Sequence, residues 1–171
     1  DELQDEEFQV LHNTLVECIK KCNGFREQEG AKLALVLADG TKNILANLKT
    51  IEPMEAERID RIKARITGSL TEGQTESNNF DRDRFEQELI FYLEKIDITE
   101  EKVRLKAHCD FFLKTLNEEE LKGKKLSFIA QEMGREINTL GSKAQHSEIQ
   151  KLIVGMKDEL EKIKEQMLNV L

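Results

Sequence analysis

The stretch Ser147-Glu-Ile-Gln-Lys-Leu-Ile-Val-Gly-Met-Lys-Asp-Glu-Leu-Glu-Lys-Ile-Lys-Glu-Gln-Met-Leu-Asn-Val170 decides the fold class of this chain. Its apolar residues alternate steps of four and three, and they are Ile149, Ile153, Met156, Leu160, Ile163, Met167 and Val170. This is the heptad pattern of a coiled coil or helix bundle, with Lys and Glu on the outer positions. Such a seam requires a facing helix, which belongs either to this chain or to a second copy in a homo-oligomer.

The composition of the whole chain also predicts an all-α fold. Leu, Ile, Glu, Lys and Gln dominate the 171 residues, whereas aromatic residues make up only 5% and Trp is absent. A sheet core would contain more Val, Tyr, Phe and Thr. No apolar run is long enough to span a bilayer, which favours a soluble, intracellular protein without a membrane partner. The formal net charge of -8 argues against a nucleic-acid binder that relies on a general basic surplus.

Upstream of the heptad stretch, helical spacing predicts a long helical region over residues 1–66. We expect a break at Asn23-Gly24, and we expect Pro53 to stand in the first turn of a further helix. The chain opens at Asp1 in the middle of a helical pattern and without Met, so we expect a truncated or processed product.

The segment 67–79 is rich in Gly, Ser, Thr and Asn and is predicted to be a linker. Residues 80–171 then form a C-terminal helical domain, in which Thr99 caps one helix and Gly141 ends another. The predicted architecture is a long-helix hairpin or extension, followed by a C-terminal helical bundle with a coiled-coil-like last helix.

Two of the three cysteines, Cys18 and Cys22, stand four residues apart on one helical face. Half of a metal site has this spacing, but no partner pair follows at the spacing of a zinc site. We therefore expect both to be small apolar core residues in a reducing compartment.

Leu126 to Leu140 is predicted to form a helix with one apolar stripe and one polar face. The carboxylates of Glu132 and Glu136 stand one turn apart, where they repel unless solvent, a cation or a divalent metal ion lies between them. Arg135 beside them is either a structural counter-ion or a phosphate clamp. Taken alone, such a face is more often solvated than functional.

A second candidate lies on the helix that follows Thr99. Glu101, Arg104 and His108 fall three and four residues apart, so they share one stripe. His108 is either a boundary histidine bonded to a carboxylate, or a metal ligand or proton shuttle. Cleavage of a phosphodiester needs a base or metal to activate the nucleophile and a cation to hold the phosphate, and this stripe contains such groups.

Basic residues gather at several places, and two of these groups flank the polar face of the 126–140 helix. The groups are Lys20-Lys21, Arg58 with Arg61, Lys63 and Arg65, Lys122 with Lys124 and Lys125, and Arg135 with Lys143. Phe128, on the polar side of that helix, is placed to stack a base or to serve as an interface residue. A local basic patch on an acidic protein is thus compatible with RNA binding.

The segment Phe128-Ile-Ala-Gln-Glu-Met-Gly-Arg-Glu-Ile-Asn-Thr-Leu-Gly-Ser-Lys143 resembles the signature F-x-x-Q-E-x-N-R-E-x-N-T-x-x-S-K of the YicC/YloC family. The likeness extends upstream to Arg26-Glu-Gln-Glu-Gly30 and downstream through residues 157–169, so it covers essentially the whole chain. Gly134 stands where the family usually has Asn, and His146 stands near a usual Asp.

The resemblance implies a metal-dependent endoribonuclease of the bacterial cytoplasm that acts on RNA and assembles as a homo-oligomer. Members of full length carry a further amino-terminal domain, so the resemblance implies that this chain is a C-terminal helical fragment. The likeness carries a possible role to Arg26, Glu29, Glu88, Asp97, Glu101, Arg104, His108, Gln131, Glu132, Arg135, Glu136, Asn138 and Lys143.

Within this set we assign roles from the chemistry of the side chains. His108, Glu132 and Glu136 are the expected ligands of a divalent cation, manganese or magnesium, and with Glu101 they are the expected catalytic residues. The expected RNA and phosphate contacts are Arg104, Arg135, Lys143, Gln131 and Asn138.

A different class of function is the alternative to this enzymatic hypothesis. In that interpretation the chain is a structural or oligomerisation module without intrinsic catalysis, and its heptad seam is the function. The polar face of the 126–140 helix then holds salt bridges between subunits.

Overall fold

The computed structural model describes residues 5–73, 82–118 and 122–168, and every regular element in these ranges is a helix. In chain order the helices are α1 (Asp5–Gly73), α2 (Arg82–Ile96), α3 (Thr99–Leu116), α4 (Gly123–Lys143) and α5 (Ser147–Met167). The predicted all-α fold is confirmed. None of the described helices is both long enough and apolar enough to cross a membrane.

Helix α1 corrects three of the predicted boundaries. It runs without a break through 69 residues, past Asn23-Gly24 and with Pro53 inside it. It also continues through residues 67–73 of the predicted linker, whose remaining residues lie outside the described ranges. A glycine in a helix costs only about 1 kcal/mol and a proline about 3 kcal/mol. Around Pro53 the buried Ile51 and the partly buried Met54 offset that cost by packing on the core.

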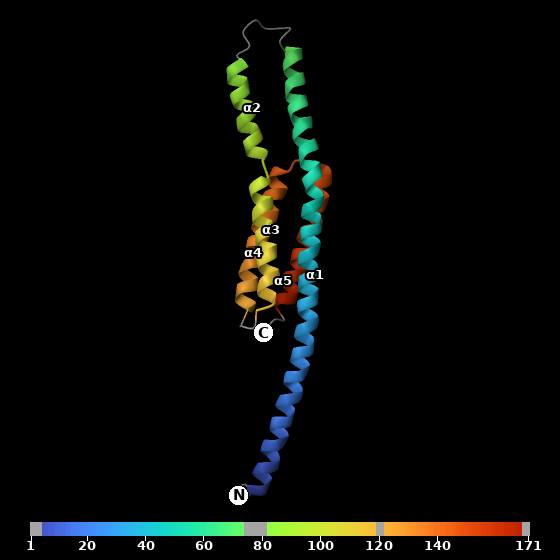
Figure 1. The fold of residues 1–171 in the computed structure, drawn as a ribbon, viewed down its shortest axis with the longest axis vertical. Helices are drawn as coiled ribbons and strands as arrows, with labels where there is room; N and C mark the ends of the chain where they lie inside the picture. The colour runs from blue at the N-terminus through green and yellow to red at the C-terminus, as the bar shows by residue number, and fades with distance from the viewer. Residues whose placement is uncertain (1–4, 74–81, 119–121, 169–171) are drawn as a thin grey trace.

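The hydrophobic core lies where α3, α4 and α5 pack beside the middle of α1 (Figure 1). The heptad residues of α5 are buried in it from Ile149 to Ile163, so their facing helices belong to this chain. Helix α1 contributes Leu37, Ile44 and Ile51 to the same core. Residues from both sides of the predicted linker therefore share one core, and the division of the chain into two domains stays a prediction.

Helices α1 and α5 approach closely because a glycine stands between them. A Cβ atom at Gly40 would lie 3.1 Å from the side chain of Ile163. Further along the same contact, Asn43 donates a hydrogen bond of 3.2 Å to the Glu159 carboxylate. The absence of a side chain at Gly40 thus leaves room for Ile163 in this contact.

The cysteine prediction is wrong for the amino-terminal pair. Cys18 and Cys22 are exposed on α1, in the part of the helix that extends beyond the bundle (Figure 1). Cys109 is buried instead, and burial raises the pKa of its thiol to about 12, which makes it a chemically inert core residue.

Arg58 of α1 also departs from the sequence prediction, because it belongs to no surface basic patch. Its guanidinium is 2% exposed and donates hydrogen bonds to the backbone carbonyls of Lys143 (3.0 Å), Ala144 (2.8 Å) and Ile96 (2.8 Å). Burial lowers the pKa of this guanidinium, against the opposing effect of the Glu55 carboxylate. Arg58 thereby fastens the ends of α2 and α4 to the middle of α1.

Replacing Arg58 by Met should lower the free energy of unfolding by about 3 kcal/mol, because buried carbonyls lose their donor. The matched control is Arg61→Met, one turn further along α1, where the exposed guanidinium pairs with Glu57 at 2.5 Å. Loss of that surface pair should cost under about 0.5 kcal/mol. Urea denaturation measures both values, and equal losses for the two variants would contradict the role given to Arg58.

Candidate functional site

The sequence-predicted residues converge on the seam between α3 and α4, which two contacts define. Near the start of α3, Glu101 accepts an ion pair of 2.6 Å from Lys143 at the end of α4. Near the other end of α3, the Lys125 ammonium lies 5.0 Å from the centre of the Phe111 ring. The two helices therefore run antiparallel, and these contacts fix which flank of each helix faces the other.

The two stripes predicted from the sequence are the facing flanks of this seam. Between the two contacts, helical spacing places Arg104 level with Glu136 and His108 level with Glu132. Two candidates that the sequence left separate thus become one site. Its composition is mixed, with an imidazole and a guanidinium on α3 opposite two carboxylates on α4.

Burial along the seam differs from residue to residue. Glu136 is only 8% exposed, whereas Glu132 is partly exposed and pairs with Arg135 at 3.4 Å. His108 is partly buried, and the Arg104 guanidinium is turned to Glu100 on its own helix. The pair with Glu100 holds the Arg104 guanidinium only weakly, because both side chains are exposed.

Glu101 is the most constrained carboxylate of the seam, at 5% exposed. One of its oxygens meets the Lys143 ammonium, and the other is buried without a hydrogen-bond partner in the described part of the chain. A buried carboxylate oxygen that lacks a donor is costly, so this position is unusual for a purely structural residue.

Asp97 sets the start of α3 and thereby the place of Glu101 and Arg104. Its carboxylate accepts hydrogen bonds from the backbone N–H (2.9 Å) and the hydroxyl (2.7 Å) of Thr99, and these bonds lower the pKa of Asp97. Thr99 was predicted to be the cap, but it is the first residue of α3; the N-cap position is Ile98, whose side chain makes no cap hydrogen bond, and Asp97 bonds the first N–H of the helix. The stability that this carboxylate adds is present above its unfolded pKa and is lost as the pH falls through the lowered one.

Three of the predicted RNA contacts lie off the seam. The Arg135 side chain is 74% exposed and points to solvent. Gln131 and Asn138 are exposed two turns apart on the flank of α4 that faces away from α3. Gln131 lines a small hollow there together with Lys164 and Met167 of α5. Of the phosphate-binding set, the structure therefore brings Arg104 and Lys143 to the seam.

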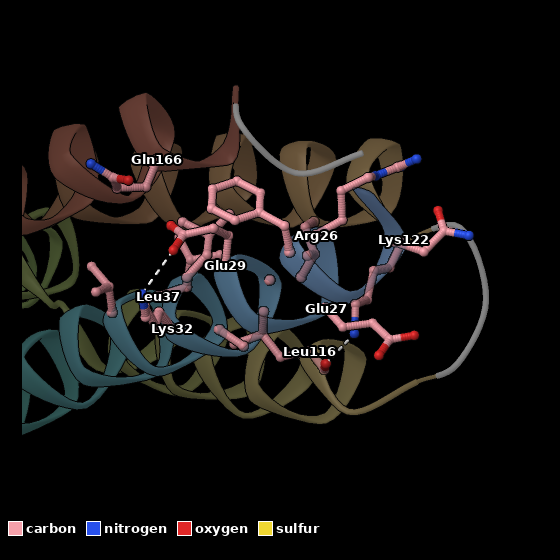
Figure 2. Close-up of a pocket in the computed structure, with 15 residues that line it drawn as sticks. Arg26, Glu27, Glu29, Lys32, Leu37, Leu116, Lys122 and Gln166 are labelled. Carbon is pink, nitrogen blue, oxygen red and sulfur yellow. Dashed lines mark hydrogen bonds and ion pairs between the residues drawn. The ribbon is translucent and has the colours of Figure 1, made fainter. Parts of the chain in front are cut away.

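A second concave surface lies at the end of the bundle, against α1 (Figure 2). We call it the end groove, and its volume is about 800 Å³. Its wall includes Arg26 and Glu29 of the Arg26–Gly30 segment, and Lys122 reaches it from the start of α4. Lys32 pairs with Glu29 at 2.8 Å, and Lys122 donates to the Leu116 carbonyl. In the sequence, the family resemblance at Arg26–Gly30 was the feature that pointed to residues of this groove.

The predicted metal ligands do not form a complete ligand group. In the ranges that the structure describes, no three His, Cys, Asp or Glu side chains stand together closely enough to hold a metal ion. His108, Glu132 and Glu136 share a seam, but they do not converge on one point within this chain. The assignment of these three as ligands stays a prediction.

The described helices and the antiparallel α3–α4 seam define the class, which is an all-α domain built beside one long helix. The chain belongs to a particular family, because residues 51–171 match the model described as "Endoribonuclease YicC-like, C-terminal". The resemblance found in the sequence is thereby confirmed.

Two similar proteins carry the name "Probable endoribonuclease YicC". The protein from Clostridioides difficile (strain 630) is 32% identical over 170 residues, which is 99% of this chain and 58% of that protein. The protein from Haemophilus influenzae (strain ATCC 51907 / DSM 11121 / KW20 / Rd) is 30% identical over 145 residues, or 85% of this chain and 50% of that protein. The chain thus spans about half the length of these relatives.

Manganese added to this chain should leave its melting temperature unchanged within about 1 °C, because the described residues hold no complete ligand group that could give stabilisation by mass action. Differential scanning calorimetry with a manganese titration, and with a chelator as the reference, measures this. A melting temperature that rises with manganese, and stops rising in the Glu132→Gln variant, would instead place a complete ligand group on the seam.

Proposed function

We propose that this chain is the helical part of an endoribonuclease that cleaves RNA phosphodiester bonds, and that the α3–α4 seam carries its RNA-contacting groups. Membership of the YicC-like endoribonuclease family and the names of the two relatives support the reaction class. The observation that supports the location is the antiparallel register, which sets His108 and Arg104 opposite Glu132 and Glu136. A bacterial, cytoplasmic setting belongs to the same proposal.

The seam offers a route to cleavage through the RNA itself. His108 is the group suited to take the proton from a ribose 2′-OH, because imidazole exchanges protons near neutral pH. The 2′ oxygen then forms a bond to phosphorus as the bond to the 5′ oxygen breaks, and the leaving oxygen takes up a proton. We expect Arg104 to stabilise the charge on the phosphoryl oxygens, because its weak, exposed pair with Glu100 leaves the guanidinium available. This route leaves a 2′,3′-cyclic phosphate.

Dependence on manganese or magnesium is the second part of the proposal. The described residues do not supply a complete ligand group by themselves, so the ion would take further ligands from elsewhere. A second copy or the additional length found in the relatives is the source that we propose. The seam would then contribute carboxylates to a shared site.

Binding of RNA tests the location. Arg104→Gln should weaken binding of a fluorescent single-stranded RNA several-fold and reduce the slope of log affinity against log salt by about 0.7, whereas Arg135→Gln, off the seam, should have the smaller effect. The matched control is Lys151→Gln on α5, an exposed cation that also pairs within its own helix, with Glu148. Fluorescence anisotropy at several salt concentrations measures all three. An equal loss in the control variant would argue for unspecific charge attraction.

Measurements of RNA cleavage test the role of His108 and the 2′-OH route. In the full-length protein, His108→Ala should slow RNA cleavage by about a hundredfold, which is the contribution of a general base. Mass spectrometry of the products should show 2′,3′-cyclic phosphate ends in the wild type. Unchanged cleavage in the variant would remove His108 from the mechanism, and products without cyclic ends would exclude the 2′-OH route while leaving the reaction class intact.

A structural or oligomerisation module is the alternative. The exposed apolar residues of α1 favour it, because they leave a surface for a further helix. This alternative predicts no RNA binding at physiological salt, together with a melting temperature that rises with protein concentration. The heptad seam of α5 does not support this alternative, because that seam is buried in the chain's own core.

A further inference from the structure

Two exposed phenylalanines stand beside the α3–α4 seam, one on each helix. Phe111 of α3 is 42% exposed and Phe128 of α4 is 63% exposed, and neither belongs to the hydrophobic core. A single exposed apolar side chain is common on a protein surface, whereas large exposed rings gathered at one place indicate a contact surface. The fold itself gains little from either ring, because both remain in contact with water.

The register of the seam sets the two rings at one level. His108 lies level with Glu132, and one turn further along the seam Phe111 follows on α3 and Phe128 on α4. Among the described residues, the two rings make no aromatic contact with each other. Neither ring therefore covers the other, and a third flat ring has room to lie against them.

A cation already lies over one face of Phe111. The Lys125 ammonium is 5.0 Å from the centre of that ring, and it also pairs with the Glu118 carboxylate at 2.7 Å. Both side chains of this ion pair are partly exposed, so water screens it and leaves the lysine available to a phosphate. Aromatic rings beside exposed cations are the combination by which proteins bind unpaired nucleic acid.

The order of groups along α3 matches the order of groups in a nucleotide chain. Arg104, His108 and Phe111 follow one another at intervals of one turn, so the row is about 10 Å long. A phosphate on Arg104 thereby leaves a neighbouring base close to the rings. We propose that Phe111 and Phe128 stack the unpaired base beside the phosphate that Arg104 holds, and that they thereby select the position of cleavage. This inference rests on the function proposed above.

Stacking of this base serves the reaction as well as the affinity. A base inside a duplex is already stacked and paired, so only an unpaired base is accessible to rings of the protein. Attack on phosphorus requires the 2′ oxygen to stand in line with the leaving 5′ oxygen, and a nucleotide held by its base is fixed in one such orientation. Every base has a π-face, so the rings select unpaired positions and not one particular base.

The fluorescent adenine analogue 2-aminopurine, whose emission falls when it stacks on an aromatic ring, tests the proposal. It is placed beside the cleaved phosphate of a short single-stranded RNA. Binding to the full-length wild-type protein should quench it, and Phe111→Leu and Phe128→Leu should each relieve the quenching and weaken binding about tenfold. The slope of log affinity against log salt should stay unchanged, because a neutral ring releases no counterions.

The matched control is Phe91→Leu on α2, which lies beyond the bundle (Figure 1), where this ring is 66% exposed. It should alter neither quenching nor affinity. An abasic nucleotide in place of the analogue should weaken binding to the wild type by the same factor as Phe111→Leu, and it should cost that variant nothing further. Circular dichroism should show the same melting for all three variants, since none of these residues belongs to the core.

The outcomes separate this inference from the proposed function. A wild-type protein that binds and cleaves the RNA, with variants at Phe111 and Phe128 equal to Phe91→Leu, would overturn the stacking role alone. Unchanged quenching together with a smaller sedimenting mass for Phe128→Leu would assign that ring to a protein interface and would overturn the proposal too. A wild-type protein that neither binds nor cleaves RNA would overturn the proposed function itself.

Discussion

The arrangement of the helices depends on one buried guanidinium. Arg58 has only donors, and its three acceptors are carbonyls at the ends of α2 and α4, which have no partner within their helices. Helix carboxyl ends carry partial negative charge, so they offset a buried cation without a carboxylate. Arg58 binds the backbone carbonyl of Lys143, and the side chain of the same lysine reaches Glu101 across the seam. The candidate site is thus positioned by a residue outside it.

What the sequence predicted correctly is local in origin. The α5 heptad and the apolar stripe of α4 repeat within one helix, so their buried residues, such as Ile153 and Met133, follow from spacing alone. The stripe of Glu101, Arg104 and His108 was found for the same reason. What spacing could not provide was the register between α3 and α4, because that register depends on two contacts between residues far apart in the chain.

The errors have physical causes as well. Asn23-Gly24 is a break signal in an isolated peptide, but two weak positions do not stop a helix whose other residues favour it. Arg58 looked like one member of a basic cluster, since composition does not distinguish a buried arginine from its exposed neighbour Arg61. Gln131 and Asn138 share a motif with Glu132, yet a helix turns by about 100° per residue, so a contiguous motif spreads over opposite flanks.

The family match begins at residue 51, but the physical unit begins earlier. The second half of α5 packs on α1 residues that precede that boundary: Gly40 meets Ile163, and Asn43 meets Glu159. Without this part of α1, the buried face of α5 would be open to water at Ile163. Residues 37–51 of this helix therefore close the core of the family domain, although most of them precede the matched range.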